Sequence, residues 1–88
     1  MAYGKYLVEF IGTFIFLSVI LTSGEAIPIG IALITAIYFG GKISGGNFNP
    51  AVSVMMHIKG TLNMTDMIAY IVAQVLGGVA ALCLHKKL

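Results

Sequence analysis

Three long apolar runs constrain this sequence more than any other feature. They extend over residues 6–21, 26–41 and 67–84, and 59% of the 88 residues are hydrophobic. Only 9% of the residues are charged, whereas about a quarter would be charged in an ordinary soluble domain. A helix that crosses a bilayer needs about 20 mainly apolar residues. We therefore expect an all-α integral membrane protein with spans at about 5–22, 26–41 and 65–85.

The first run also has some features of a secretory signal, because Lys5 precedes it and the small residues Ser23 and Gly24 follow it. Glu9 interrupts the run, however, and its length of about 17 residues exceeds the roughly 7–15 residues of a signal's apolar region. The run is therefore interpreted as a retained span.

Charged and metal-ligating side chains are scattered along the chain. The net charge is +2 without a basic stripe, so nucleic acid is not an expected partner. Cys83 is the single cysteine and predicts neither a disulfide framework nor a thiolate metal site. His57 and His85 lie far apart without carboxylates at ligand spacing, and both are interpreted as membrane-edge residues. No metal or cofactor is expected.

The segment between the second and third runs is the most polar part of the chain and the richest in helix breakers. It reads ISGGNFNPAV at residues 43–52. From Pro50 to Ile58 the pattern becomes helical, with Asn49 as the cap and proline at the first position. Such a helix is roughly 14 Å long, about half of a hydrocarbon core of about 30 Å. It is too short to span a membrane and too apolar to lie free in water.

Two structures would accommodate this segment. In the first, residues 43–49 dive inward as an extended loop and a half-helix returns from Pro50, forming a re-entrant segment over about 43–58 with its positive N-terminus near the midplane. In the second, a surface loop precedes an amphipathic helix that lies on the membrane. The spacing of the residues leaves both interpretations open.

Small residues and one amide indicate how the spans pack. The small residues recur every four positions at Ala32, Ala36 and Gly40, and at Ala69, Ala73, Gly77 and Ala81. This pattern lets membrane helices approach closely, and we expect Gly12, Gly77 and Gly78 to serve helix packing. Gln74 is polar at membrane depth, so we expect it to face protein and form a structural hydrogen bond.

Three motifs resemble one known family. SGGNFNPAV at residues 44–52 resembles the first signature loop of the major intrinsic proteins, the aquaporins and aquaglyceroporins, with Asn49, Pro50 and Ala51 as the NPA triplet. VEFIGTF at residues 8–14 resembles the first helix of this family, and IAYIVAQVLGG at residues 68–78 resembles its third helix. The likeness runs over nearly all 88 residues and is to the first, N-terminal repeat.

The resemblance implies both a fold and an activity. Residues 1–88 would form a single half-repeat, with three transmembrane helices and a re-entrant half-helix, and would meet a second half at two NPA triplets in mid-membrane. The implied activity is that of a passive channel for water or small neutral solutes such as glycerol, which is not an enzyme. The implied location is a multi-pass protein of the plasma membrane with a cytoplasmic N-terminus.

The resemblance also implies roles for individual residues. Asn49 would donate its amide N–H to a passing solute, while Pro50 and Ala51 would hold the half-helix against its partner. The backbone carbonyls at the pore mouth would accept hydrogen bonds and belong to Gly45, Gly46 and Asn47. Glu9 would accept backbone N–H groups of the loop, a role that also has a physical reason because a carboxylate at membrane depth needs donors. The alternative for Glu9 is a position near the membrane edge, reaching for water.

The chain departs from the family pattern at several positions. Ile29, counted twenty residues before Asn49, falls at a constriction that usually holds a larger or aromatic residue. Asn47 stands where the family often has histidine. Val52 follows Ala51, as in a first repeat, where the second signature carries arginine. The sequence contains no convincing second copy of the repeat.

A half-repeat alone cannot enclose a pore, so we expect a second half. The candidates are an inverted copy in a homo-oligomer, a complementary half-chain, or the remainder of a longer chain. Three lysines would face the cytoplasm (Lys5, Lys42 and Lys59) and two the other side (Lys86 and Lys87), a weak bias that allows an inverted homodimer. Membrane lipid and the solute complete the expected partners. The alternative function is a non-conducting truncated or regulatory protein that associates with full-length family members.

Overall fold

The computed structural model describes residues 3–88 and contains four helices. These are α1 (Gly4–Thr22), α2 (Ala26–Ser44), α3 (Pro50–Lys59) and α4 (Met64–Lys87). The described residues include no strand, and the predicted all-α class is confirmed. The helices α1, α2 and α4 are long and apolar enough to cross a membrane, whereas α3 has only 10 residues.

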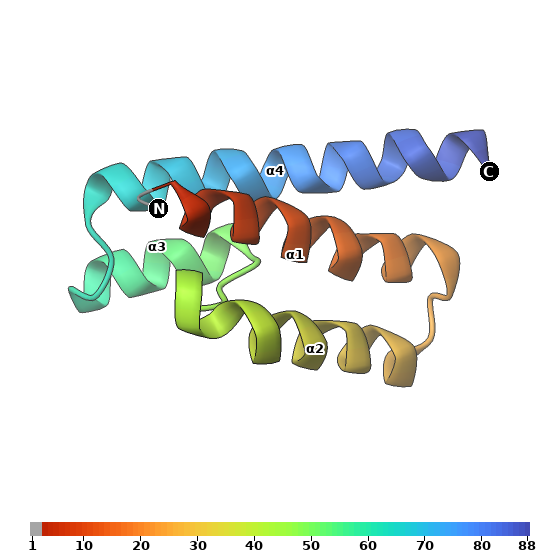
Figure 1. The fold of residues 1–88 in the computed structure, drawn as a ribbon, viewed down its shortest axis with the longest axis horizontal. Helices are drawn as coiled ribbons and strands as arrows, with labels where there is room; N and C mark the ends of the chain where they lie inside the picture. The colour runs from red at the N-terminus through yellow and green to blue at the C-terminus, as the bar shows by residue number, and fades with distance from the viewer. Residues whose placement is uncertain (1–2) are drawn as a thin grey trace.

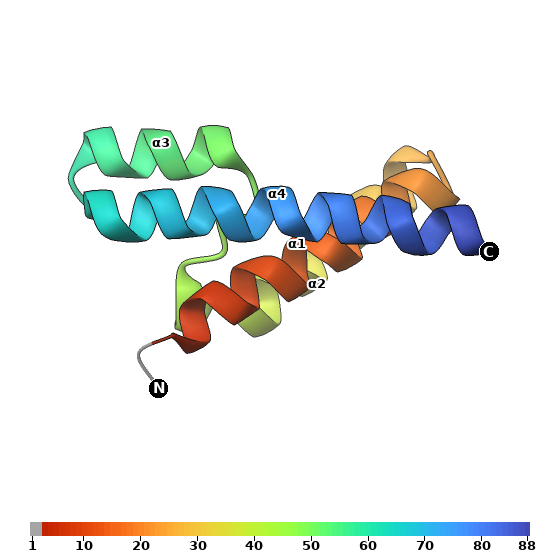
Figure 2. The same ribbon diagram turned by 90° about the horizontal axis from the view of Figure 1, so that it is seen from above.

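The helix α1 lies between α2 and α4 and packs on both, while α3 packs on α4 (Figure 1). After α2 the chain turns back along the bundle, so that α3 starts partway along its length and runs toward the end where α2 stops (Figure 1). Seen from above, α3 lies beside the N-terminal half of α4 and leaves the C-terminal half of α4 without a neighbour on that side (Figure 2). The side of α4 that α3 contacts is therefore only half covered.

The helix α2 continues to Ser44, beyond the end expected at residue 41, because its glycine pair at residues 40–41 does not break it. It ends where Gly45 adopts a φ of +92° and donates its N–H to the Gly41 carbonyl at 2.8 Å. This left-handed conformation favours glycine and commonly closes helices. The loop that enters the bundle is thus residues 45–49 instead of 43–49. Pro28 lies in the first turn of α2, where it removes no helical hydrogen bond.

Small residues allow α1 and α4 to approach closely. A Cβ atom at Gly77 would lie 2.8 Å from the Phe10 carbonyl oxygen, and one at Gly78 would lie 2.9 Å from the Leu17 side chain. Ala73 is buried on the same side of α4. The predicted small-residue pattern therefore coincides with the contact between α4 and α1.

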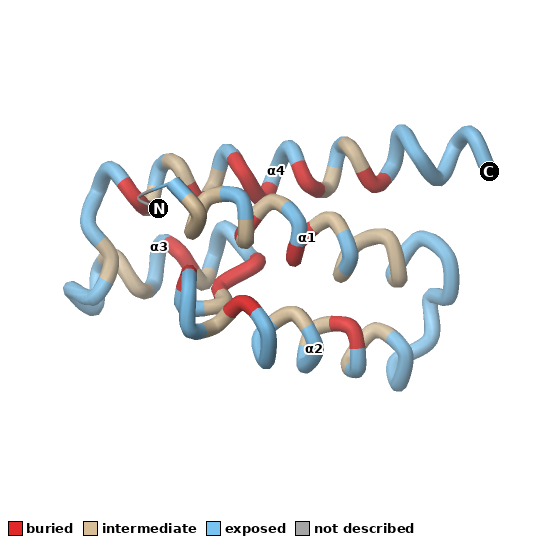
Figure 3. The backbone as a smooth tube through the Cα atoms, in the orientation of Figure 1, coloured by how far each residue is buried: buried red, intermediate tan, exposed pale blue. Residues whose placement is uncertain are grey.

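Polar residues fill the interior, and apolar residues cover most of the outside. The buried residues gather where the loop meets α1 and α4 (Figure 3). Four of the largest fully buried side chains are polar, namely Glu9, Thr13, Ser53 and Gln74. Large apolar side chains are exposed along all four helices. This arrangement is typical of membrane helices, whose rare polar groups face the bundle interior.

Candidate functional site

The loop between α2 and α3 follows a backbone path that depends on left-handed conformations. The φ angles of Gly45, Gly46 and Phe48 are +92°, +67° and +52°. Glycine adopts such values without a steric penalty, whereas they are uncommon for a residue as bulky as phenylalanine. Phe48 therefore holds a strained conformation that persists only because its surroundings determine it.

The Phe48 ring is held by packing between α1 and α2. The residue is only 2% exposed. A Cβ atom at Gly12 would overlap the ring, and one at Gly40 would lie 3.2 Å from ring atom Cζ. Both glycines thus leave the space that the ring occupies. Gly12, which was expected to serve helix packing, lies where α1 contacts the loop.

The carboxylate of Glu9 joins the loop to the second turn of α1. Its Oε1 atom accepts the backbone N–H of Phe48 at 2.8 Å, and its Oε2 atom accepts that of Asn47 at 3.1 Å. The Ser44 hydroxyl and the Gln74 side-chain amide donate to the same carboxylate at 2.7 and 2.8 Å. Glu9 is fully buried, so its carboxylate has no exposed surface in the described part of the chain. These four donors, which come from α2, the loop and α4, satisfy a buried acceptor group.

Ser53 extends this network into α3. Its Oγ atom accepts the side-chain amide of Asn47 at 3.0 Å and that of Gln74 at 2.9 Å. The Asn47 side chain therefore turns inward, toward α3. The network ties the first turn of α3 to α4 and fixes where α3 starts.

The tip of α3, defined as residues 49–51, lies at the surface. Asn49 is the N-cap, and its Oδ1 atom accepts the N–H of Ala51 at 2.8 Å. The side-chain Nδ2 group has no hydrogen-bond partner among residues 3–88 and can donate to a ligand. All three residues of the tip are exposed. The tip therefore presents a hydrogen-bond donor beside the positive end of a helix dipole.

A groove of about 510 Å³ begins at this tip and follows the C-terminal half of α4. It is lined by Thr13, Phe16, Leu17, Phe48, Asn49, Pro50, Gln74, Val75, Gly78, Val79 and Leu82. Two of the lining residues carry buried polar atoms without a partner among the described residues, namely Thr13 Oγ1 and Gln74 Oε1. A buried polar group is normally hydrogen-bonded. Both atoms are shielded from the groove, which presents a mainly apolar wall with the Asn49 tip at one end.

The remaining predicted site residues lie at different places. Gly45 is exposed and Gly46 half-buried at the start of the loop. Ile29 is half-buried in the first turns of α2, at the opposite end of that helix from Gly45. The structure therefore brings Glu9 and Gln74 together with the loop but leaves Ile29 apart from them. Within residues 3–88 no three His, Cys, Asp or Glu side chains gather as a metal site would require.

Sequence reasoning missed several residues of the network, including Ser44, Ser53 and Phe48. It also missed Asp66 and Tyr70, although a signal for them exists. Asp66 and Tyr70 lie eight and four positions before Gln74 in the sequence, and the structure buries all three on α4. This spacing marks one helical face. The left-handed conformation of Phe48 has no such signal.

Comparison with known proteins agrees with these features. The family model described as major intrinsic protein matches residues 1–88. The chain belongs to the major intrinsic protein family. The family resemblance stated from the motifs is thereby confirmed.

The relatives are longer than this chain. Glycerol uptake facilitator protein-like 6 of Lactiplantibacillus plantarum is 44% identical over an alignment of 87 residues. The match covers 88% of this chain and 40% of that protein. Aquaporin Z of Brucella melitensis is 50% identical over 58 residues, and Aquaporin Z of Photorhabdus laumondii is 41% identical over 58 residues. Each of these two alignments covers 66% of this chain and 25% of the relative. No solved structure gives a significant match.

Proposed function

We propose that residues 3–88 of this major intrinsic protein form one wall of a passive channel for water or small neutral solutes. The observation that carries the proposal is the exposed tip of α3 beside the groove. In a bilayer, the Asn49 side-chain amide, which donates to no acceptor among residues 3–88, would be unsatisfied against lipid at a cost of several kcal/mol. A second protein segment beside the groove would keep lipid away from this amide.

The length of α3 and the half of α4 that it leaves uncovered indicate what that segment is. The helix α3 has 10 residues and is about 15 Å long, and it covers only the N-terminal half of α4 (Figure 2). A second short helix, running in the opposite direction, would cover the other half and meet α3 tip to tip. The segment would thus be a second half-helix.

The proposed mechanism is passage of solute along one polar wall. The Asn49 side-chain amide would donate a hydrogen bond to each solute in turn, and the backbone carbonyls of residues 45–47 would accept hydrogen bonds at the pore mouth. The positive ends of two half-helices would oppose cations at the centre. No bond is made or broken, so the protein would not be an enzyme and would need no cofactor.

The second half could come from an inverted copy, a complementary half-chain or a further part of a longer chain. The names of the relatives, a glycerol uptake facilitator-like protein and Aquaporin Z, support glycerol and water as the solutes to test. The lysines bear on the inverted copy, and Lys5 is paired with Asp66 at 2.7 Å. The pairing does not remove Lys5 from the count, so three lysines stand at one end against Lys86 and Lys87 at the other, a weak orientation bias that allows an inverted copy. We propose the plasma membrane as the location, with the N-terminus cytoplasmic in at least one orientation.

The test is osmotic shrinkage of vesicles, measured by stopped-flow light scattering. One arm contains the chain alone, and a second contains it with the C-terminal half of one of the relatives. We expect at least one arm to shrink faster than empty vesicles in response to sucrose. A rate equal to that of empty vesicles in both arms would show that the proposal is wrong. A gain in the second arm alone would exclude the inverted copy as the partner.

A matched pair of variants attributes any conduction to the tip. Asn49 and Asn63 both cap a helix through Oδ1, at 2.8 Å from Ala51 N and 2.7 Å from Asp66 N. Aspartate keeps this acceptor, removes the side-chain donor and adds a negative charge at either position. We expect Asn49→Asp to lower the protein-dependent rate several-fold and Asn63→Asp to leave it unchanged. Equal effects of the two variants would place the conducting path elsewhere.

A further inference from the structure

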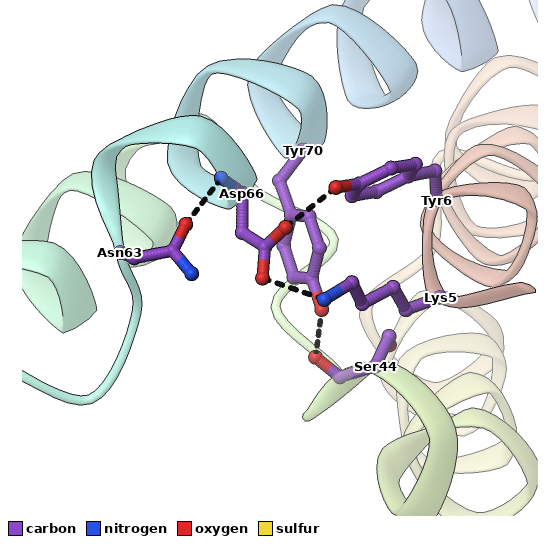
Figure 4. Close-up of polar contacts among 6 residues, drawn as sticks. All are labelled: Lys5, Tyr6, Ser44, Asn63, Asp66 and Tyr70. Atoms are coloured by element: carbon purple, nitrogen blue, oxygen red, sulfur yellow. Dashed lines mark hydrogen bonds and ion pairs between the residues drawn. The ribbon is translucent and has the colours of Figure 1, made fainter. Parts of the chain in front are cut away.

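A second polar cluster lies at the end of the bundle where α1 and α4 begin and α2 ends (Figure 4). At its centre the Tyr70 hydroxyl donates to the Ser44 carbonyl oxygen at 2.6 Å. Tyr70 is 2% exposed and Ser44 is 7% exposed, so this hydrogen bond is shielded from solvent. It joins α4 directly to the last residue of α2.

Ser44 connects more elements than any other residue of the cluster. Its carbonyl lies at the C-terminus of α2, where carbonyl groups have no partner within the helix. Its hydroxyl donates to Glu9 Oε2 at 2.7 Å and accepts the N–H of Gly46 at 3.1 Å. Ser44 is therefore held from α1, from α4 and from the loop at once.

The Tyr70 ring is itself held by the outer part of the cluster. The ring of Tyr6 meets it edge-on, with centroids 6.1 Å apart and an interplanar angle of 80°, a favourable geometry for aromatic pairs. One turn before Tyr70, the Asp66 carboxylate accepts the Tyr6 hydroxyl at 2.6 Å and the Lys5 ammonium at 2.7 Å. Asn63 caps the first turn of α4 at Asp66 N. The direction of the Tyr70 hydroxyl is thus fixed by α1 as well as by α4.

We propose that Tyr70 is a positioning residue that sets the direction of the backbone carbonyls of residues 45–47. The reason is the conformational freedom of the loop. Gly45 and Gly46 have φ angles of +92° and +67°, and glycine alone does not restrict these angles. Hydrogen bonds from outside must therefore select the orientation of the peptides. Ser44 and Glu9 hold the N–H groups of the peptides that carry these carbonyls, and Tyr70 acts on them by holding Ser44 at its carbonyl oxygen. The proposed contribution to the pore mouth rests on the proposed function, whereas the hold on the loop does not.

The test compares Tyr70→Phe with Tyr38→Phe. Tyr70→Phe removes only the hydroxyl and keeps the ring packed against Tyr6. Tyr38 is 76% exposed and stacks edge-on against Phe39 at 5.1 Å, and its hydroxyl makes no hydrogen bond among residues 3–88. Circular dichroism of both variants in detergent checks that the helices are retained. Asp66→Asn is a third variant. It weakens the support that Tyr6 gives to the Tyr70 ring and keeps the Tyr70 hydroxyl.

The first readout is hydrogen–deuterium exchange at the backbone amides of residues 46–48, which Ser44 and Glu9 hold. Loss of one buried hydrogen bond is worth roughly a five- to tenfold change in local opening. We expect exchange to accelerate by about that factor in Tyr70→Phe, by less in Asp66→Asn, and not in Tyr38→Phe. Unchanged exchange in Tyr70→Phe would overturn the inference, whether or not the wild-type chain conducts.

The second readout is the ratio of glycerol to water permeability, in the vesicle arm that conducts. A changed direction of the carbonyls would alter this ratio, whereas a smaller amount of folded protein would lower both rates equally. We expect a shift of at least twofold in Tyr70→Phe and none in Tyr38→Phe. An unchanged ratio would overturn the role at the pore mouth. If no arm conducts, the proposed function fails, and the exchange rates alone decide whether Tyr70 positions the loop.

Discussion

The Glu9 carboxylate accepts the backbone N–H of Phe48 at 2.8 Å, and this bond joins the second turn of α1 to the residue before the tip of α3. Phe48 has a φ of +52°, a conformation that costs of order 1–3 kcal/mol. Glu9 and the ring contacts of Phe48 together hold it there. The position of Asn49 therefore depends on a residue 40 positions earlier in the sequence.

Replacing Glu9 by glutamine tests this dependence. The new amide nitrogen would face donors, so at least two of the four hydrogen bonds to the carboxylate would be lost. We expect the free energy of unfolding in detergent to fall by about 3 kcal/mol or more, because buried polar groups would remain unpaired. Glu25→Gln is the control, since Glu25 is exposed. A loss as small as that of Glu25→Gln would show that the carboxylate does not hold the loop.

Alanine substitutions at Gly12 and Gly30 distinguish a steric clash with the loop from the general effect of alanine on helix stability. A Cβ atom at Gly12 would overlap the Phe48 ring, whereas one at Gly30 would have no neighbour within 4 Å. We expect Gly12→Ala to lower the free energy of unfolding by about 1–3 kcal/mol and Gly30→Ala to raise it by up to about 1 kcal/mol. Thermal and denaturant unfolding followed by circular dichroism measure both.

The ring contact can be isolated with a second substitution. If overlap with Phe48 causes the loss, then Phe48→Leu combined with Gly12→Ala will be less destabilised than the sum of the single variants. Additive losses would mean that the glycine is needed for another reason.

The part of this structure that sequence predicts well is the part set by local patterns. The apolar runs predict the all-α class, and Asn49 before Pro50 is a local cap signal that α3 shows. The apolar run ends at residue 41, before Lys42, and the span was expected to end there, whereas α2 continues to Ser44. The helix ends where Gly45 adopts a left-handed conformation. The residues next to Gly45 in the sequence do not distinguish it from several other glycines.

The site was only partly predictable because its contacts join distant residues. Glu9 was expected to bind the loop, since a carboxylate at membrane depth needs donors. Its donors Ser44 and Gln74 are 35 and 65 positions away, and no local pattern pairs them with it. The same holds for Tyr70 and Ser44, which are 26 positions apart. Such pairs follow from how the helices pack, which single-residue patterns do not specify.

The ion pair of Lys5 and Asp66 predicts a dependence of stability on salt. Their side chains are 34% and 12% exposed and lie 2.7 Å apart, so dissolved ions can screen the interaction. We expect Lys5→Met to lower the thermal midpoint at low salt and to make little difference at about 1 M salt, where the screening length is about 3 Å. Lys42→Met is the control, because Lys42 has no ion pair among residues 3–88. A loss independent of salt would assign the effect to packing of the lysine stem.

The groove can be filled without disturbing the helices around it. Val79 and Val72 both lie on α4 and are 54% and 52% exposed, but only Val79 lines the groove. Tryptophan at either position projects from the surface of the described chain, so we expect each variant to change the free energy of unfolding by less than about 0.5 kcal/mol.

We expect the two variants to differ in conduction, which requires the second half-helix. Val79→Trp would occupy the place of that helix, and we expect the protein-dependent rate of vesicle shrinkage to fall several-fold, while Val72→Trp leaves it unchanged. Glycerol uptake measured in the same vesicles should fall together with water, because assembly and not selectivity is blocked. Full conduction by Val79→Trp would mean that nothing packs into the groove, and the tip of α3 would then need another partner.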